Sequence, residues 1–175
     1  MLMNARGILC MPIIGDRLDK LDIPLMVRSS DQSKLETAFT VPVDYTEGTT
    51  TGVSSHDRSA TIKALINSNS TASDFSQPGH VFPLRYEEGG VLVRAGHTEA
   101  IVDLARIAGL YPAGVICEII KDDGNMARMP DLEQLAKKHD FKIVTIAQII
   151  EYRRRYEKLI ERVAEARLPT KYGKF

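Results

Sequence analysis

The stretch from Val91 to Gly109 constrains the fold most, because it predicts a strand, a tight turn and a helix in direct succession. Residues 91–93 form a short apolar run of the kind found in strands. From Thr98 onward apolar residues recur at helical spacing, and Gly109 is a typical helix end. Residues 94–98 would then form a turn that opens on a helix N-terminus, where backbone N–H groups and the helix dipole favour an anion.

The residues of this turn suggest a phosphate and metal site. Arg94 would offer a forked positive charge to phosphate oxygens, and Gly96 would let the backbone approach a ligand closely. His97 could ligate a metal ion or transfer a proton. The same run is also compatible with a structural role, in which Thr98 caps the helix and His97 is a surface histidine.

A candidate acid or base lies in the segment Ala113–Ile120. This segment is a nearly continuous apolar run, as expected of a strand buried on both faces, and Glu118 is its only carboxylate. A buried carboxylate is costly unless it is paired, protonated or metal-bound, and burial would raise its pKa toward neutrality. The alternative is a glutamate at a strand end that pairs with a surface lysine.

A second candidate acid or base is His80, in the segment Gln77–Arg85. Two prolines and a glycine exclude regular helix there and predict an irregular loop. A histidine held on a rigid loop suits proton transfer, although in isolation such a residue is more often an ordinary loop histidine.

The remaining pattern predicts a single α+β domain with a mixed β-sheet and packed helices. Strands are expected at Ile8–Pro12, at Ala38–Val43, at Phe141–Thr145 and on both sides of the helix that begins at Thr98. Helices are expected at Gly15–Leu21, at Asp57–Ile66 with Asp57 as its cap, and at Asp131–His139. A long helix capped by Thr145 would carry one apolar face, made of Ile149, Ile150, Tyr156, Leu159, Ile160 and Val163. A loop at 67–79 and a turn at 122–124 complete the prediction.

Composition excludes several classes of protein. The 23 basic and 23 acidic residues cancel, which argues against a nucleic-acid partner, and the basic run within residues 151–157 is best explained as a solvated helix face. No apolar run of about 20 residues predicts a membrane span, and no signal pattern opens the chain. We therefore expect a cytoplasmic protein in which Cys10 and Cys117 are reduced thiols.

Several segments, taken in order, resemble 3,4-dihydroxy-2-butanone 4-phosphate synthase. The resemblance runs from Gly7 to Arg154, and the segments that carry it are 49–58, 78–85, 89–100, 112–118 and 122–128. It implies a lyase of riboflavin biosynthesis that converts D-ribulose 5-phosphate to 3,4-dihydroxy-2-butanone 4-phosphate and formate. It further implies use of Mg²⁺ or Mn²⁺ and a homodimer with sites near the subunit interface.

The resemblance also implies a role for individual residues. His97 matches a metal ligand, and His80 and Glu118 match the two groups essential for proton transfer. The residues implied to lie at the substrate are Arg94, Ala95, Gly96, His97, Thr98, Glu118, Cys10, Thr50 and Thr51. A divalent ion would stabilise the enediolate formed when the ketose phosphate loses a proton beside its carbonyl.

The resemblance divides the chain in two. Residues 1–154 match the synthase domain without the N-terminal strand and the acidic loop that supplies a second metal ligand in the family. Residues 155–175 resemble a helical linker and the first residues of the GTP cyclohydrolase II domain of bifunctional riboflavin enzymes. Two hypotheses follow, namely a lyase represented by a fragment of a bifunctional protein, and an inactive fragment or non-catalytic, dimerising relic of the same domain.

Overall fold

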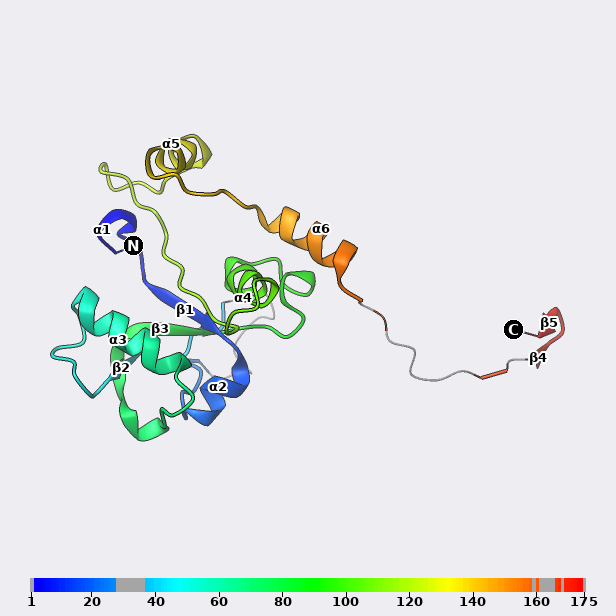
Figure 1. Cartoon of the computed structure of the whole chain (residues 1–175), viewed down its shortest axis with the longest axis horizontal. Helices are drawn as coiled ribbons and strands as arrows, with labels where there is room; N and C mark the ends of the chain where they lie inside the picture. Colours follow the sequence, from blue (N-terminus) through cyan, green and yellow to red (C-terminus); the bar gives the residue numbers. More distant parts are fainter. Residues whose placement is uncertain (1, 28–36, 159, 161–165, 168, 175) are drawn as a thin grey trace.

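A three-stranded mixed sheet organises the structure, a computed structural model that describes residues 2–27, 37–158, 160, 166–167 and 169–174. The long central strand β3 (Phe75–Arg85) runs parallel to β1 (Cys10–Ile13) on one side and antiparallel to β2 (Val43–Tyr45) on the other. A separate two-stranded pair joins β4 (Pro169–Thr170) to β5 (Gly173–Lys174) near the C-terminus. The mixed sheet with packed helices confirms the predicted α+β class (Figure 1).

Six α-helices and two 3-10 helices accompany the sheet in the described residues, and α4, α5 and α6 follow its last strand in the chain. The α-helices are α1 (Leu2–Ala5), α2 (Gly15–Lys20), α3 (Ser55–Ile66), α4 (His97–Ile107), α5 (Met129–His139) and α6 (Ile146–Tyr156). Two 3-10 helices, η2 (Ala72–Asp74) and η3 (Gly90–Leu92), flank β3. Among the described residues, no helix is long and apolar enough to cross a membrane.

The main core lies where the sheet meets α2 and α3. Alternate residues of β1, Met11 and Ile13, join Leu18, Leu65 and Val81 in a cluster with almost no exposed surface. The buried Arg17 side chain ties α2 to the far end of α3, because its guanidinium donates to the carbonyl oxygens of residues 65, 67 and 70. These hydrogen bonds hold α2 and the end of α3 together beside the sheet.

A smaller core joins α4, α6 and η3. Val91, Ala100 and Ile149 are buried there, and Ile150 packs against them. The predicted cap of α6 is confirmed, since the Thr145 hydroxyl accepts a hydrogen bond from the backbone N–H of residue 148. Leu159 and Val163, which the sequence assigned to the same apolar face, lie outside the described residues.

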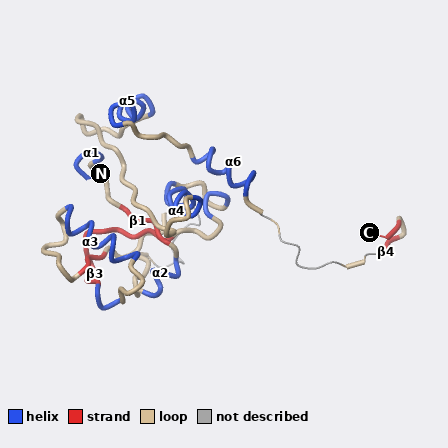
Figure 2. The backbone as a smooth tube through the Cα atoms, viewed as in Figure 1, coloured by secondary structure: helices blue, strands red, loops and turns tan. Residues whose placement is uncertain are grey.

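Four predicted strands are wrong or displaced. Residues 91–93 fall largely in η3, because Gly89 and Gly90 both take positive φ angles and turn the chain. Residues 113–120 make isolated bridges without a regular strand, and residues 141–145 form no strand in the described structure. The strand expected at 38–43 is shifted to β2, although Phe39 and Thr40 form isolated bridges. The long loop segments are visible in Figure 2.

Three smaller expectations are also corrected. The cap of α3 is Ser54, and Asp57 lies in its first turn and donates its N–H to that cap. The cap of α4 is Gly96 rather than Thr98. The loop expected at 67–79 is interrupted by η2 and by the start of β3. The helices near 15–21 and 131–139, the helix end before Gly109 and the turn at 122–124 are confirmed. The long helix predicted after Thr145 is shorter than expected, because α6 ends at Tyr156 and leaves Tyr156 and Ile160 of the predicted apolar face exposed.

Candidate functional site

An irregular excursion of β3 presents His80. Val43 and Asp44 are consecutive on β2, but they pair with Val81 and Ser76, so residues 77–80 have no partner in that ladder. Such irregularities re-aim side chains next to many active sites. The predicted irregular loop is therefore present, but as an excursion within a strand.

Asp44 holds His80 from two directions. One carboxylate oxygen accepts the His80 backbone N–H at 2.8 Å, and the other lies 2.6 Å from His80 Nδ1. Asp44 is buried, whereas the His80 side chain is 47% exposed. An ionised carboxylate beside Nδ1 favours a proton on that nitrogen, which leaves Nε2 as the acceptor that faces outward.

The loop at residues 49–52, called here the threonine loop, lies against the Asp44–His80 pair. The Asp57 carboxylate accepts the Thr50 hydroxyl at 2.8 Å and the Gly52 backbone N–H at 3.0 Å, and Thr50 is the first cause of the lowered pKa of Asp57. A Cβ on Gly52 would lie 2.8 Å from His80 Nδ1 and would collide with the Asp44 carboxylate. The loop is thus fixed against His80, and Thr51 lies exposed beside it.

Glu118 lies on the opposite side of β1 from β3. Its carboxylate Oε2 accepts the Ile8 backbone N–H at 2.9 Å, and its carbonyl oxygen accepts the Gly7 N–H at 3.2 Å. The side chain is exposed, so the predicted burial is wrong, because residues 113–120 border the sheet as a strap of isolated bridges. The partner of the carboxylate is a backbone N–H rather than the lysine considered as an alternative.

Cys10 sits between the two acid–base candidates. It pairs with Phe82 of β3 on one side and with Ile116 of the strap on the other. His80 lies two residues before Phe82, and Glu118 lies two residues after Ile116. Because β1 is parallel to β3 and antiparallel to the strap, both side chains lie toward the same end of the sheet.

The Cys10 thiol itself is protected from ionisation. Burial, followed by the charges of Glu118 and Cys117, raises the pKa of Cys10 to about 11. Both cysteines are free thiols, as the sequence predicts. A thiol that stays protonated at neutral pH is a poor nucleophile, so Cys10 serves as an apolar wall.

The predicted phosphate turn has a different internal structure. Arg94 Nη1 donates to Glu99 at 2.6 Å, and Nη2 donates to the Thr37 hydroxyl at 3.0 Å. Glu99 is 1% exposed and Arg94 is 17% exposed, so this ion pair is an internal brace of the turn. Arg94 Nε is buried and has no hydrogen-bond partner within the described part of the chain.

The rest of the turn separates buried from exposed residues. Thr98 is buried, whereas Ala95 and His97 are exposed and Gly96 lies between these extremes. His97 is the first residue of α4, which packs on β1 and on the strap through Ile101 and Gly114. The structure therefore brings His97 to the neighbourhood of β1 but records no hydrogen bond from it to His80 or Glu118 in the described residues.

The described residues do not by themselves form a metal centre. No group of three or more His, Cys, Asp or Glu side chains that could hold a metal ion occurs in residues 2–27, 37–158 and the short described stretches beyond. Glu99, the carboxylate nearest to His97 in sequence, is occupied by Arg94. Magnesium prefers about six ligands, most of them oxygen atoms. His97 can offer one ring nitrogen, so it would fill at most one position of such a site.

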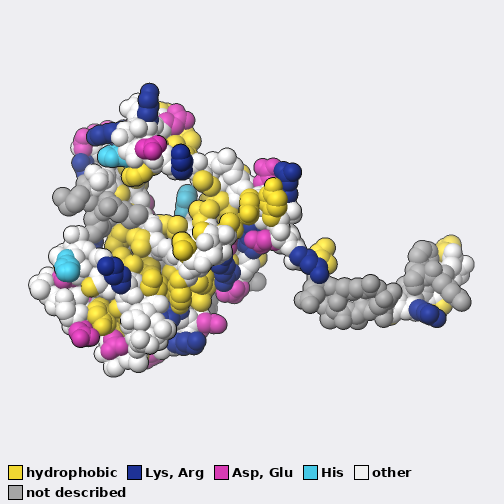
Figure 3. Space-filling view, in the orientation of Figure 1, with side chains coloured by type: hydrophobic (Ala, Val, Ile, Leu, Met, Phe, Trp, Pro, Cys, Tyr) yellow, Lys and Arg dark blue, Asp and Glu magenta, His cyan; other side chains and the backbone are white. Residues whose placement is uncertain are grey.

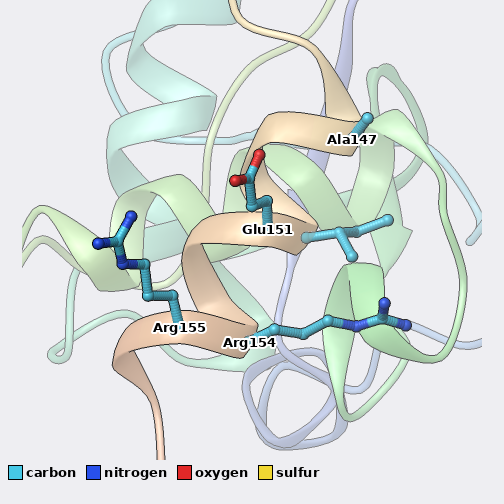
Figure 4. Close-up of a pocket in the computed structure, with 5 residues that line it drawn as sticks. Ala147, Glu151, Arg154 and Arg155 are labelled. Atoms are coloured by element: carbon cyan, nitrogen blue, oxygen red, sulfur yellow. The ribbon is translucent and has the colours of Figure 1, made fainter.

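Two pockets formed by described residues lie away from these groups. A pocket of about 570 Å³ on α6 is lined by Ala147, Ile150, Glu151, Arg154 and Arg155, as Figure 4 shows. A polar pocket of about 340 Å³ lies between the strap and α5. Figure 3 shows that hydrophobic side chains gather over a broad area on this face of the molecule. His80, His97 and Glu118 line neither of these two pockets.

Sequence reasoning missed the backbone and carboxylate partners of the predicted groups. Asp44 follows the apolar run 41–43 and is buried, so the lone-carboxylate signal that identified Glu118 would have identified it too. Gly7 and Gly52 make close contacts with Glu118 and Asp44 that depend on pairing distant parts of the chain. No local sequence signal reports such contacts.

An α+β domain that displays a carboxylate-backed histidine and a second carboxylate at one end of a sheet defines a candidate acid–base enzyme. Residues 1–152 match the family of 3,4-dihydroxy-2-butanone 4-phosphate synthase. The riboflavin biosynthesis protein RibBA of Aquifex aeolicus is 56% identical over 173 residues, and the bifunctional riboflavin biosynthesis protein RIBA 1 of Arabidopsis thaliana is 53% identical over 173 residues. Each match covers 98% of this chain, which spans 42% and 32% of those proteins, respectively.

Solved structures agree with the sequence comparison. A two-domain 3,4-dihydroxy-2-butanone 4-phosphate synthase from A. baumannii has a TM-score of 0.88 at 47% identity, and it covers all of this chain and 51% of its own. A 3,4-dihydroxy-2-butanone 4-phosphate synthase in complex with two magnesium ions has a TM-score of 0.82 at 37% identity, covering 91% of this chain and 79% of its own. The chain therefore belongs to the 3,4-dihydroxy-2-butanone 4-phosphate synthase family.

Proposed function

We propose that this chain carries the synthase chemistry of riboflavin biosynthesis, in which D-ribulose 5-phosphate yields 3,4-dihydroxy-2-butanone 4-phosphate and formate. The observation that carries the proposal is the pair of supported acid–base groups, His80 on Asp44 and Glu118 on Ile8, at one end of β1 in a member of this family. The reaction moves several protons, so two separately held groups suit it.

In this proposal His80 exchanges protons through Nε2. Asp44 fixes the ring by its contact with Nδ1 and stabilises the positive charge that develops when Nε2 takes a proton. The backbone contact between His80 N–H and Asp44 prevents the excursion of residues 77–80 from drifting away from β2. The proton acceptor is thereby held in one orientation.

Glu118 is the second group in the proposed mechanism. Its Oε2 atom is engaged by Ile8, so Oε1 is the oxygen that would meet the proton beside the substrate carbonyl. Thr50, Thr51, Cys10 and the turn residues Arg94, Ala95, Gly96 and Thr98 would enclose the substrate. Because Arg94 already pairs with Glu99, the exposed N-terminus of α4 is better placed than the guanidinium to meet the phosphate.

We propose that the reaction also uses a divalent cation, Mg²⁺ or Mn²⁺, with His97 as one ligand. A family member has been solved with two magnesium ions. The described residues supply no complete site, so the other ligands would come from substrate oxygens or from a second subunit of a homodimer. The cation would supply charge stabilisation at the substrate carbonyl oxygen.

The second candidate function is a non-catalytic, dimerising relic, or an inactive fragment, of the same domain. The observation that favours it is the absence, among the described residues, of a metal-binding group of side chains. From the family resemblance we also propose residues 1–154 as the synthase domain and residues 155–175 as a helical linker into a cyclohydrolase-like domain.

Formate release from D-ribulose 5-phosphate with magnesium tests the two functions. We would assay this chain and a chimera in which it replaces the matching 173-residue segment of the Aquifex aeolicus relative. Formate from either protein, lost in its Glu118→Ala variant, would support the lyase. A folded chimera without formate release would favour the relic.

A further inference from the structure

The Glu118 carboxylate is held by an irregular turn of backbone at Gly7 and Ile8. Cys10 pairs with Ile116, whereas Arg6 pairs with Ile119. Three residues of the N-terminal segment, 7–9, therefore lie between these two bridges, opposite two residues of the strap, 117 and 118. One extra residue in the N-terminal segment is the defining feature of a β-bulge.

The bulge redirects one backbone N–H from a backbone acceptor to a side chain. Gly7 N–H donates to the Glu118 carbonyl, and the next N–H, that of Ile8, donates to Glu118 Oε2 at 2.9 Å. Residue 118 thus accepts two consecutive N–H groups, one through its backbone and one through its side chain. This arrangement fixes the carboxylate without a charged partner.

The absence of a side chain at residue 7 permits this contact. A Cβ on Gly7 would lie 2.6 Å from Glu118 Oε2, 2.8 Å from its Cβ and 2.5 Å from its carbonyl oxygen. The carbonyl oxygen and the Cβ of Glu118 do not move when its carboxylate rotates, so rotation of the carboxylate alone would not relieve the clash. The φ angle of Gly7 lies outside the left-handed region, so alanine is opposed by the clash and not by its own backbone.

We propose that Gly7 and the Ile8 N–H form a positioning clamp that orients the Glu118 carboxylate for proton transfer, with Gly7 as the residue that permits the close approach. The clamp rests on the proposed function for its catalytic meaning. It assigns Gly7 and Ile8 as positioning residues, because they would act on the substrate through Glu118. Oε2 is fixed by the clamp, and Oε1 points to the reacting proton.

Two readouts test the clamp in the same protein. Hydrogen exchange of the Ile8 amide reports the bond directly, whether or not the protein is active. The rate of formate release, separated into kcat and KM, reports its consequence. In Gly7→Ala we expect the Ile8 amide to exchange faster and kcat to fall about 100-fold with little change in KM, since a displacement of about 1 Å has this order of effect.

Two further variants separate the clamp from general damage. Glu118→Gln keeps a carbonyl oxygen that can accept the Ile8 N–H, so it should retain slow exchange while losing formate release. Gly109→Ala is the matched control, because Gly109 has a φ of 69° and nothing within 4 Å of an added Cβ, and it follows the far end of α4. It should lose some stability through backbone strain while keeping kcat.

The exchange rates and the kcat values together distinguish a positioning clamp from general destabilisation. Unchanged Ile8 exchange in Gly7→Ala, or faster exchange with normal kcat, would overturn the clamp. An equal loss of kcat in Gly109→Ala would also overturn it, because general destabilisation would then explain the effect. A wild-type protein without formate release would contradict the proposed function and the catalytic meaning of the clamp, while the exchange rate would still show whether the bond to Ile8 exists.

Discussion

Two groups of charged side chains differ in how fully the fold satisfies them. The internal group comprises the Asp103–Arg153 and Glu99–Arg94 pairs, whose carboxylates are each 1% exposed. The open group comprises His80, held by Asp44, and Glu118, held by the Ile8 backbone N–H. The side chains of His80 and Glu118 are exposed. The Asp103–Arg153 pair joins α4 to α6, and the Glu99–Arg94 pair braces the turn before α4. Under the proposed function, each pair of the open group leaves one atom to meet a substrate.

Within the internal group, the Asp103–Arg153 pair has a partner for each of its polar atoms. Asp103 accepts the Tyr86 hydroxyl, the Val91 backbone N–H and the Arg153 guanidinium, each at 2.8 Å. Burial and the Asp103 charge raise the pKa of the Tyr86 hydroxyl, which remains protonated and keeps donating. Arg153 also donates to the Gly89 carbonyl and to Glu157, and so joins α6 to η3 and α4. No group in this network is left for chemistry.

The largest expected effect is on the exposed candidate groups Glu118, from the open group, and His97, at the start of α4. Glu118→Ala and His97→Ala should each lower formate release by about 1,000-fold, within the range for loss of an acid–base or metal-binding group. Both side chains are exposed, so the free energy of unfolding should change by less than about 0.5 kcal/mol. Formate assays and urea unfolding measure the two quantities, and near-normal turnover in either variant would remove that residue from the site.

The opposite result is expected for the internal group. Asp103→Ala should lower the free energy of unfolding by about 3–5 kcal/mol, because it leaves the Arg153 charge and the partner N–H and O–H groups buried and unpaired. Urea unfolding measures this loss, with the half-exposed Asp123→Ala as the matched control. A loss below about 1 kcal/mol would show that the network contributes little to attaching α6.

Asp44 tests the boundary between the groups, because it is buried but supports an exposed histidine. Asp44→Asn should lower kcat by about 100-fold and shift the pH profile of kcat, since an amide neither favours the same ring tautomer nor stabilises the protonated ring. A purely structural role would leave the pH profile unchanged. Unaltered kcat would mean that His80 acts without Asp44.

The smallest expected effect concerns the loop over His80. Hydrogen bonds from Thr50 and Gly52 lower the pKa of Asp57, so its contribution to stability should be complete above the ordinary carboxyl range near pH 4. It should be lost as the pH falls through the lower folded-state pKa. Urea unfolding of wild type and Asp57→Asn between pH 6 and pH 2 measures this, and parallel pH dependence in the two proteins would contradict it.

The sequence could predict features that depend on neighbouring residues, but not contacts between distant parts of the chain. Local signals located α2, α5, α6 and most of α4, because caps, helix-ending glycines and apolar spacing act within a few residues. They also singled out His80, His97 and Glu118 as candidate acid–base or metal-binding groups, which stay predictions. The pairing of Asp44 with His80 joins residues 36 apart, and that of Ile8 with Glu118 joins residues 110 apart, so no local pattern reported either.

The errors have physical causes in particular residues. The apolar run at 91–93 looked like a strand, but consecutive positive φ angles at Gly89 and Gly90 curl it into a turn. The apolar run at 113–120 looked doubly buried, but it meets the sheet through isolated bridges and leaves Glu118 exposed. The phosphate contact predicted for Arg94 stays a prediction, and its guanidinium also pairs with Glu99.

The most direct test of the proposed function is the stoichiometry of the products formed from D-ribulose 5-phosphate in the presence of magnesium. The chimera that carries this chain in the Aquifex aeolicus relative should release formate and 3,4-dihydroxy-2-butanone 4-phosphate in equal amounts, and Glu118→Ala should abolish both. A folded chimera that binds D-ribulose 5-phosphate but yields neither product would contradict the assignment of this chain as a synthase.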